Sequence, residues 1–231
     1  MHIIFDHAEI LKPGVSTFWF QPESRLRYEP GQFIELYLPH APADERGERR
    51  EFSLSSSPHE PLLAVTTNFD FDNGSTFKHE LRNLKPSEHV AVNEPMGDFV
   101  LPKDASIPLI FVAAGIGSAP YASMVKWLSA KSERRDIRLI YSVRKPEDFL
   151  FLKEWQAYGL HFTPIITQPD NQWPGQAGRL NAARIIELAG PLQNKLTYLA
   201  GPQSMIEPIF NDLLATGLTR SEVLLDYFSG Y

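Results

Sequence analysis

The fold is decided by residues 108–120, which read PLIFVAAGIGSAP. Residues 108–113 form a short apolar run of the kind that a buried parallel strand shows. A glycine-rich turn follows, and Pro120 suits the start of a helix because its missing amide proton costs nothing there. This helix is expected to gather four apolar side chains on one face: Tyr121, Met124, Val125 and Leu128. A strand that leads through glycines into a helix is a building unit of parallel α/β sheets.

The same alternation continues toward the end of the chain. We expect further strands at 137–143, 160–167, 196–200 and 222–228, and helices at 146–156, at 181–188 and between Gly201 and Gly217. Alternating strands and helices predict a doubly wound parallel sheet.

The first hundred residues follow another pattern, with short strands separated by turn residues. Segments 8–11 and 17–20 flank a Lys12-Pro13-Gly14 turn and predict a hairpin. Strands are also expected at 34–38, 50–55, 62–67 and 89–93, and a helix at 75–83. This pattern predicts an antiparallel β-barrel. Because residues 101–106 lack apolar periodicity, we place the boundary there, which gives domains 1–103 and 104–231.

The composition excludes several classes of protein. Hydrophobic residues make up 43% of the 231 residues and charged residues 22%, the balance of a folded globular chain. A net charge of −6 argues against nucleic acid or an anionic membrane as a partner. The lack of cysteine excludes disulfides, a catalytic thiol and an iron–sulfur cluster held by thiolates of this chain.

Targeting and metal-binding signals are also missing from the sequence. No apolar run approaches the roughly 20 residues of a membrane span, and residues 1–10 do not resemble a signal peptide. The histidines show no ligand spacing. We therefore expect a cytoplasmic protein with no membrane span and no metal site.

The turn from Gly115 to Pro120 is a candidate anion site. Glycines let the backbone approach a phosphate, and the start of a helix presents unpaired amides to it. An ordinary strand-to-helix turn explains the same residues equally well, and the segment lacks the last glycine of the dinucleotide fingerprint. Gly201 and Pro202, after the strand at 196–200, give a similar but weaker signal.

The strand at 137–143 ends near Ser142, Arg144 and Lys145. The adenosine half of a dinucleotide lies beside such a strand end. An acidic residue there favours NAD, whereas Ser142 and Arg144 favour the 2′-phosphate of NADP. Two solvated cations are an equally good interpretation.

In the first domain, alternation places Arg50 and Phe52 on one face of a strand, and Ser53 and Ser55 on the other. An arginine can hold a phosphate, and a phenylalanine offers a flat apolar surface. Without context, an ordinary strand with an aromatic core residue is the simpler interpretation.

Taken in order, these segments resemble the ferredoxin–NADP(H) reductase superfamily of flavoenzymes, over about residues 31–231. The resemblance is carried by segments in family order: Pro30-Gly31-Gln32-Phe33, Arg50-Glu51-Phe52-Ser53, residues 84–99, Ala114 to Pro120, Tyr141-Ser142-Val143-Arg144, residues 173–179, Ala200 to Met205, and Asp226 to Tyr231. Each segment is a weak signal alone, but their order and spacing together are specific.

The resemblance implies FAD in the first domain. Arg50 would face the pyrophosphate of the flavin, and Phe52 would pack on the isoalloxazine ring. Ser53 would hydrogen-bond near the reactive N5, with Asp226 and Phe228 as further residues of the reaction. The other implied FAD contacts are Leu54, Ser55, Ser75, Thr76 and, as a second cation, Lys78.

For NADPH or NADH, the resemblance implies a site in the second domain. The implied contacts are Gly115, Gly117, Ser118, Pro120, Ser142, Arg144, Gly201, Pro202 and Met205. Phe228 and Tyr231 would lie near the flavin face at which the nicotinamide enters. Four residues depart from the family pattern: Ala114 stands for Gly, Phe52 for Tyr, Ala200 for Cys and Asp226 for Glu.

The implied function is a flavin-dependent oxidoreductase that takes a hydride from NAD(P)H and passes electrons to a separate acceptor. This acceptor would be a protein (a ferredoxin, a flavodoxin or an oxygenase component) or a small molecule. Basic patches for an acidic protein acceptor are offered by Arg25 with Arg27, by Arg46 with Arg49, and by Lys131 with Arg134 and Arg135. The sequence does not indicate an oligomeric state.

Two alternatives stay open at this point. Ala200 and Phe52 suggest a non-catalytic module that binds flavin or nucleotide as a sensor or a regulatory subunit. An NAD(P)H-binding protein without flavin is the other alternative, and it would leave Arg50 without a role.

Overall fold

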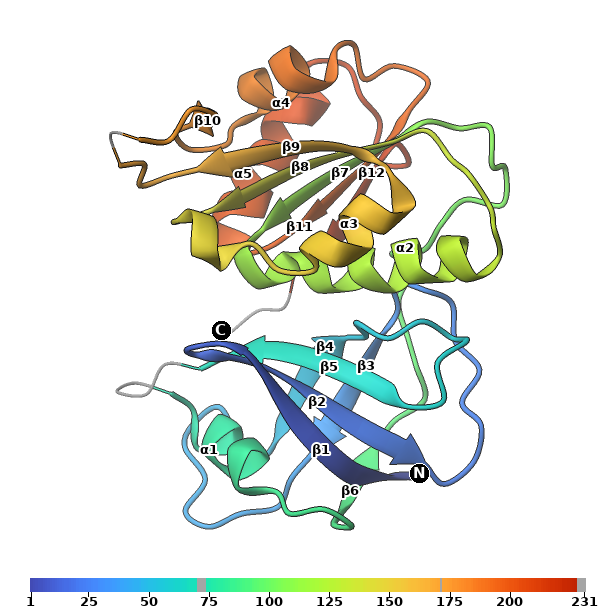
Figure 1. Cartoon of the computed structure of the whole chain (residues 1–231), viewed down its shortest axis with the longest axis vertical. Coiled ribbons are helices and arrows are strands. Elements are labelled where there is room, and N and C mark those ends of the chain that lie inside the picture. Colours follow the sequence, from blue (N-terminus) through green and yellow to red (C-terminus); the bar gives the residue numbers. More distant parts are fainter. Residues whose placement is uncertain (70–73, 171, 228–231) are drawn as a thin grey trace.

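The computed structural model describes residues 1–69, 74–170 and 172–227. It contains two separate sheets, which form the lower and the upper part of the molecule in Figure 1. The first sheet is antiparallel, in the order β4-β3-β6-β1-β2-β5. Its strands are β1 (His2–Lys12), β2 (Val15–Pro22), β3 (Phe33–Tyr37), β4 (Arg49–Ser53), β5 (Leu63–Asn68) and β6 (His89–Val92).

The first sheet closes into a barrel. A bridge between Leu54 and Val65 joins the chain after β4 to β5, the two outer strands of the sheet order. Alternating side chains such as Ile34 and Leu36 point into the core, as the two-residue period of a strand requires. Helix α1 (Thr76–Asn83) packs Phe77 and Leu81 into the same core. The predicted antiparallel barrel is confirmed.

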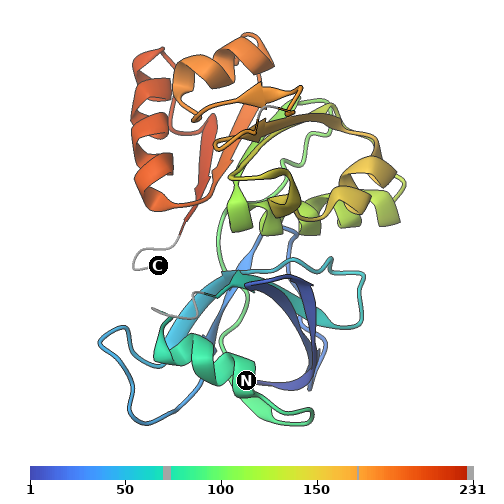
Figure 2. The ribbon, with the colours of Figure 1, turned by 60° about the vertical axis from the view of Figure 1, so that its left-hand side comes forward.

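The second sheet is parallel, in the order β10-β9-β8-β7-β11-β12. Its strands are β7 (Leu109–Ala114), β8 (Ile137–Val143), β9 (His161–Ile166), β10 (Gln176–Ala177), β11 (Leu196–Ala200) and β12 (Val223–Asp226). Helices cover both faces (Figure 2), with α2 (Ala119–Ala130) and α3 (Leu152–Tyr158) in one core and α4 (Ala182–Ala189) and α5 (Gln203–Ala215) in the other. The predicted doubly wound sheet is therefore confirmed.

Helix α2 lies between the parallel sheet and the barrel (Figure 1). Its polar side chains bind the chain that follows β4: Ser123 Oγ donates to the carbonyl oxygen of Ser56 at 2.5 Å, and Lys126 Nζ to that of Ser55 at 3.2 Å.

Gly31 has a φ of +101°, and a Cβ there would lie 2.0 Å from the carbonyl oxygen of Phe99. The glycine of the Pro30-Gly31 segment thus permits a close backbone approach.

One predicted helix, at 146–156, is wrong. The chain forms a single 3₁₀ turn, η2 (Pro146–Asp148), and enters α3 only after Phe151, whose φ is +57°. Between them Phe149 packs edge-on against Tyr141, with ring centroids 5.2 Å apart, and Leu150 is buried. Burying these two side chains against the sheet outweighs the continuation of the helix, because helical stability comes mostly from tertiary packing.

Candidate active site at the seam of the two sheets

The candidate site begins at the carboxyl ends of β7 and β11. From β7 the chain moves to β8 on one side, and it later returns to β11 on the other side, so the strand order reverses between these two strands. Ligands of open α/β sheets bind in the crevice at such a reversal. β7 leads into the 3₁₀ turn η1 (Gly115–Ser118), and β11 leads into Gly201 and Pro202.

The glycines of the two turns are required for different physical reasons. A Cβ on Gly117 would lie 2.3 Å from the carbonyl oxygen of Ala200, and a Cβ on Gly201 would lie 2.9 Å from Cβ of Ala114. These two glycines therefore let the turns pack against each other. Gly115 has a φ of +53° and is exposed, and a Cβ on it would meet nothing within 4 Å, so there is room for a ligand beside its backbone.

The hydroxyl of Ser118 is used inside the protein. Ser118 is fully buried, and its Oγ lies 2.9 Å from the hydroxyl of Tyr141 and 3.2 Å from the carbonyl oxygen of Gly115. Tyr141 also donates to that carbonyl at 2.9 Å, and burial raises its pKa to about 12, so it stays protonated. The structure thus places Ser118 beneath the turn, where it holds the shape of the turn with Tyr141, a residue that the sequence analysis did not single out.

The other predicted dinucleotide contacts surround this turn. Ser142 is the second-last residue of β8, pairs with Ala114 of β7 and is buried. Arg144 is exposed and forms no ion pair within the described part of the chain. Pro120 is buried in the first turn of α2, Pro202 is exposed, and Met205 is half-buried in the first turn of α5.

The two domains meet in a buried hydrogen bond between the last residue of β4 and the last residue of β12. Ser53 Oγ donates to Asp226 Oδ2 at 2.8 Å, and the two residues are 8% and 9% exposed. The carbonyl oxygen of Asp226 also accepts from the amide of Gly201, at 3.3 Å. Asp226 therefore contacts both the barrel strand predicted to carry the flavin and the turn predicted to face the nicotinamide.

The environment of Asp226 changes its acidity. Burial raises the pKa of this carboxyl to about 6, against the lowering effect of the Ser53 hydrogen bond, and the negative charge of Glu51 acts in the same direction as burial. A carboxyl that titrates near neutrality inside the protein can exchange a proton with a neighbouring group.

A cluster of cations lies at the start of α1, next to the barrel. Arg50 is only 6% exposed, its Nη1 donates to the carbonyl oxygens of Arg46 and Arg49, and its guanidinium lies 5.5 Å from the ring of Phe77. Lys78 Nζ donates to the carbonyl oxygen of Asn68 at 2.9 Å. Burial, with the charges of Arg50 and Arg46, lowers the pKa of Lys78 to about 8.

The remaining barrel residues of the prediction have structural partners. Ser75 caps α1, since its hydroxyl accepts from the amide of Lys78 at 3.2 Å. Phe52 lies in the barrel core, with its ring centroid 6.0 Å from that of Phe77, and Leu54 is fully buried in the same core. Ser55 Oγ lies 2.8 Å from Thr66 Oγ1.

The structure thus brings Ser53, Asp226 and Gly201 together, and it places Arg50, Ser75, Thr76 and Lys78 in a second group around the start of α1. Phe228 and Tyr231 lie outside the described residues. One residue of the second group, Asp44, was missed by the sequence analysis. Its carboxylate accepts from the backbone amide of Thr76, a contact across 32 residues that no local pattern signals.

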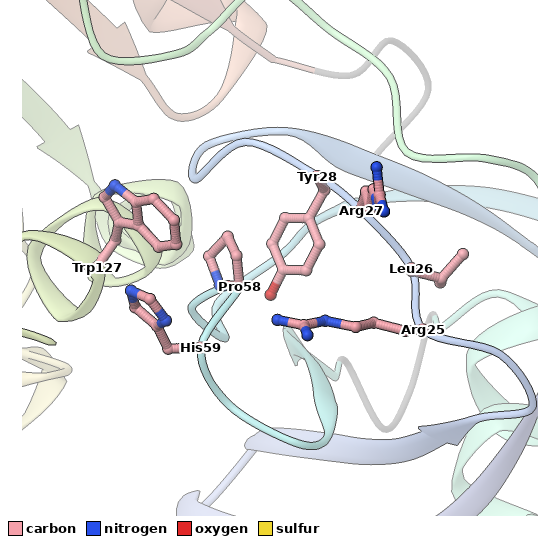
Figure 3. A pocket seen from close by; sticks show the side chains of 7 residues that line it. All are labelled: Arg25, Leu26, Arg27, Tyr28, Pro58, His59 and Trp127. Carbon is pink, nitrogen blue, oxygen red and sulfur yellow. The ribbon is translucent and has the colours of Figure 1, made fainter. Parts of the chain in front are cut away.

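A separate pocket of about 380 Å³ lies at the other end of α2 (Figure 3). It is lined by Arg25, Leu26, Arg27, Tyr28, Pro58, His59 and Trp127. His59 stacks on Trp127 with ring centroids 4.3 Å apart, and Lys131 Nζ lies 4.2 Å from the centroid of the same indole. None of the residues predicted to contact FAD or NAD(P)H lines this pocket, but Arg25 and Arg27, predicted as a basic patch for the acceptor, do.

Within residues 1–69, 74–170 and 172–227, no helix has the length and apolar character to cross a membrane, and no three His, Asp or Glu side chains group as metal ligands would.

Comparison with known proteins gives a match to a family model and similarity to curated proteins. Residues 111–209 match the family model described as the oxidoreductase NAD-binding domain. The CDP-6-deoxy-L-threo-D-glycero-4-hexulose-3-dehydrase reductase of Yersinia pestis is 26% identical over 211 residues, which are 90% of this chain and 61% of that protein. The chain spans between about half and three fifths of the length of the curated relatives that it matches first.

Solved structures share the whole fold. The flavohem-like FAD/NAD binding domain of a Vibrio cholerae nitric oxide dioxygenase gives a TM-score of 0.82 at 19% identity, with 98% of each chain covered. A ferredoxin NADP⁺ reductase from Neisseria gonorrhoeae, solved with bound FAD and NADP, gives 0.80 at 19% identity, covering 98% of this chain and 97% of that one.

An antiparallel barrel joined to a doubly wound sheet is the fold that this chain shares with these solved structures, and a buried acid lies where the barrel and the sheet meet. Residues 111–209 thus match an oxidoreductase NAD-binding domain, and the whole chain has the fold of solved proteins that resemble the ferredoxin reductases. The resemblance inferred from the sequence is confirmed.

Proposed function

We propose that the chain is a reductase module that transfers a hydride from NAD(P)H to FAD and passes electrons to a separate acceptor. The observation that carries the proposal is the hydrogen bond between Ser53 and Asp226, because it joins the flavin side of the site to the nicotinamide side. The proposed domains are 1–103 for FAD and 104–231 for NAD(P)H.

The residues around α1 suit the pyrophosphate of FAD. Arg46, Arg50 and Lys78 are cations grouped at the start of a helix, and both features favour a phosphate. The ring system would then extend from this cluster along β4 toward Ser53. When bound, FAD supplies the chemistry that the chain lacks, namely acceptance of a hydride and release of single electrons.

Ser53 and Asp226 would handle the proton that accompanies this chemistry. The Ser53 hydroxyl donates to the ionised carboxylate, which leaves the lone pairs of its oxygen free to accept a hydrogen bond from an N–H of the flavin, were FAD bound there. A proton received by Ser53 can pass to Asp226, whose pKa of about 6 makes it a base at neutral pH.

The exposed backbone of Gly115 would receive the pyrophosphate of NAD(P)H at the start of α2. The exposed side chain of Arg144 suits the 2′-phosphate of NADPH, because it makes no ion pair in the described ranges. NADPH is therefore the proposed donor. Ala200, where the family has Cys, pairs with Asp226 and would not obstruct a nicotinamide ring.

The acceptor is proposed to be a separate molecule, because the chain contains no cysteine to hold an iron–sulfur cluster. The surface that best suits an acidic protein acceptor is the rim of the pocket in Figure 3, which Arg25 and Arg27 line and where Lys131 Nζ lies 4.2 Å from the ring centroid of Trp127. The other basic pairs are engaged by carboxylates, as Arg49 is by Glu35 at 2.6 Å and Arg135 by Glu133 at 2.6 Å. Reduction of a ferredoxin should slow as salt rises, while reduction of an uncharged quinone should not.

The test is an absorbance spectrum of the purified protein, reconstituted with FAD and titrated with NADPH without oxygen. Bleaching of the flavin band is expected on addition of about one equivalent. A band that persists with both NADPH and NADH would contradict the reductase and favour the non-catalytic module. Failure to bind FAD at all would contradict the assignment of the barrel.

A further inference from the structure

The start of α1 is occupied by a carboxylate of the chain itself. Asp44 Oδ2 accepts from the amide of Thr76 at 3.0 Å, and the amide of Asp44 donates to Thr76 Oγ1 at 3.0 Å. His40 Nε2 lies 2.8 Å from the same Oγ1. The loop before β4 is therefore fastened to the first residue of the helix by two reciprocal bonds.

The same carboxylate is bound by the cations assigned to the pyrophosphate. Arg46 donates to Asp44 Oδ2 through Nε at 3.2 Å and Nη2 at 2.9 Å, and Nη2 of Arg50 lies 3.8 Å from Oδ1. Burial acts to raise the pKa of Asp44, but the hydrogen bonds from Thr76 and Arg46, with the charge of Arg46, keep it below its usual value, so the group is an anion at neutral pH.

This loop also covers Arg50. The guanidinium donates to the carbonyl oxygens of Arg46, Gly47 and Arg49, and the side chain is 6% exposed. A phosphate cannot contact the cation while the loop stays in this position. The amide of Thr76 likewise points at Asp44 and has no second hydrogen to offer.

We propose that Asp44 is an internal anion that occupies the pyrophosphate site and must be displaced, with its loop, when FAD binds. The proposal rests on the proposed function, since it takes the FAD site as given. It makes Asp44 a determinant of cofactor affinity: the free protein is held closed, and FAD is bound as an exchangeable cofactor.

An alternative role for Asp44, as a support for the cations that bind FAD, predicts the opposite change in FAD affinity. If Asp44 only held Arg46 and Arg50 in place for the phosphate, removal of its charge would weaken FAD binding. The sign of the change therefore distinguishes a competitor from a support.

The experiment measures the dissociation constants of FAD and riboflavin for the apoprotein by quenching of flavin fluorescence. Asp44→Asn is compared with Glu45→Gln, which removes the neighbouring charge from an exposed side chain. We expect Asp44→Asn to bind FAD about tenfold more tightly than the wild type, the effect of one charge-assisted bond. Riboflavin, which has no phosphate, should bind equally to both proteins.

Weaker FAD binding in Asp44→Asn, or a change no larger than that of Glu45→Gln, would overturn the proposal. Asp44→Ser, which keeps a hydroxyl acceptor for Thr76, gives the same test if the first variant does not fold. Wild-type protein that binds FAD, and loses it in Arg50→Ala, would uphold the proposed function even if Asp44 fails this test.

Discussion

The barrel and the parallel sheet each present a helix start to a phosphate group, but they do so with different chemistry. In the barrel, Arg46, Arg50 and Lys78 bring charge, and the protein itself balances that charge with Asp44. In the sheet, the turn from Gly115 to Ser118 brings only backbone, and its sequence contains no charged residue.

The difference has a physical cause. Burial, together with the charges of Arg50 and Arg46, lowers the pKa of Lys78, so a buried group of cations without a ligand gains from an internal carboxylate. Backbone amides at a helix start carry only partial charge and need no counter-ion. The barrel site should therefore depend on charge and salt, and the sheet site on shape.

The sharpest test of the charged site is Arg50→Ala. FAD binding should weaken about a hundredfold, because a buried charge-assisted contact contributes roughly 1.5–3 kcal/mol. Flavin fluorescence quenching measures the change. Arg49→Ala is the matched control, since Arg49 is its neighbour but is mostly exposed and bound to Glu35. Equal FAD affinity in the two variants would remove Arg50 from the site.

The corresponding test of the shape-dependent site is Gly117→Ala. A Cβ 2.3 Å from the carbonyl oxygen of Ala200 forces the two turns apart, and we expect a loss of about 2 kcal/mol in the free energy of unfolding, with weaker NADPH binding. Gly115→Ala meets open space and should cost about 1 kcal/mol through its left-handed backbone alone. Urea denaturation compares them, and a Gly117 variant as stable as the Gly115 variant would contradict the packing argument.

Asp226 joins the two regions, so its titration tests whether they act as one site. When release of electrons to ferricyanide limits turnover, the rate should rise about tenfold between pH 5 and pH 7, as the carboxyl with a pKa of about 6 becomes the base. Asp226→Asn should lose this rise. Equal pH profiles would exclude Asp226 as the proton acceptor.

The same titration of Asp226 affects stability in the opposite direction to the rate. Because the folded carboxyl holds its proton up to about pH 6, the folded state binds more protons than the unfolded one between about pH 4 and pH 6. The free energy of unfolding of the wild type should therefore fall as the pH rises from about 4 to 6. Asp226→Asn should abolish the part of this fall that comes from Asp226. Thermal unfolding across this pH interval gives a readout independent of activity.

These sites were not equally visible in the sequence. The strand, the glycine turn and the helix at 108–120 follow from local apolar periods, and the structure has them as β7, η1 and α2. The purpose of Gly117 and Gly201 was not visible, because their contacts come from a strand pairing more than 80 residues apart. Local sequence reports that a glycine is needed, but only the fold shows what lies against it.

Asp44 gave no signal at all in the sequence. It precedes the strand that carries Arg50 by only a few residues, and its partner Thr76 comes from a helix beyond β5. This contact arises only when the loop before β4 meets the start of α1 in the fold, so no hydrophobic periodicity in the sequence predicts it. The meeting of Ser53 and Asp226 was expected only through the family resemblance, because 173 residues separate them.

The smallest expected effect concerns Arg144, at the edge of the uncharged site. If the sheet site recognises its ligand mainly by shape, charge should matter there only for the part of NADPH that NADH lacks. Arg144→Ala should raise the KM for NADPH about fivefold, the upper range for an exposed ion pair, and leave the KM for NADH unchanged. Lys153→Ala removes an exposed cation from α3 and serves as the control. An equal rise for both dinucleotides would mean that Arg144 contacts the shared pyrophosphate, and the contrast between a charged barrel site and an uncharged sheet site would then fail.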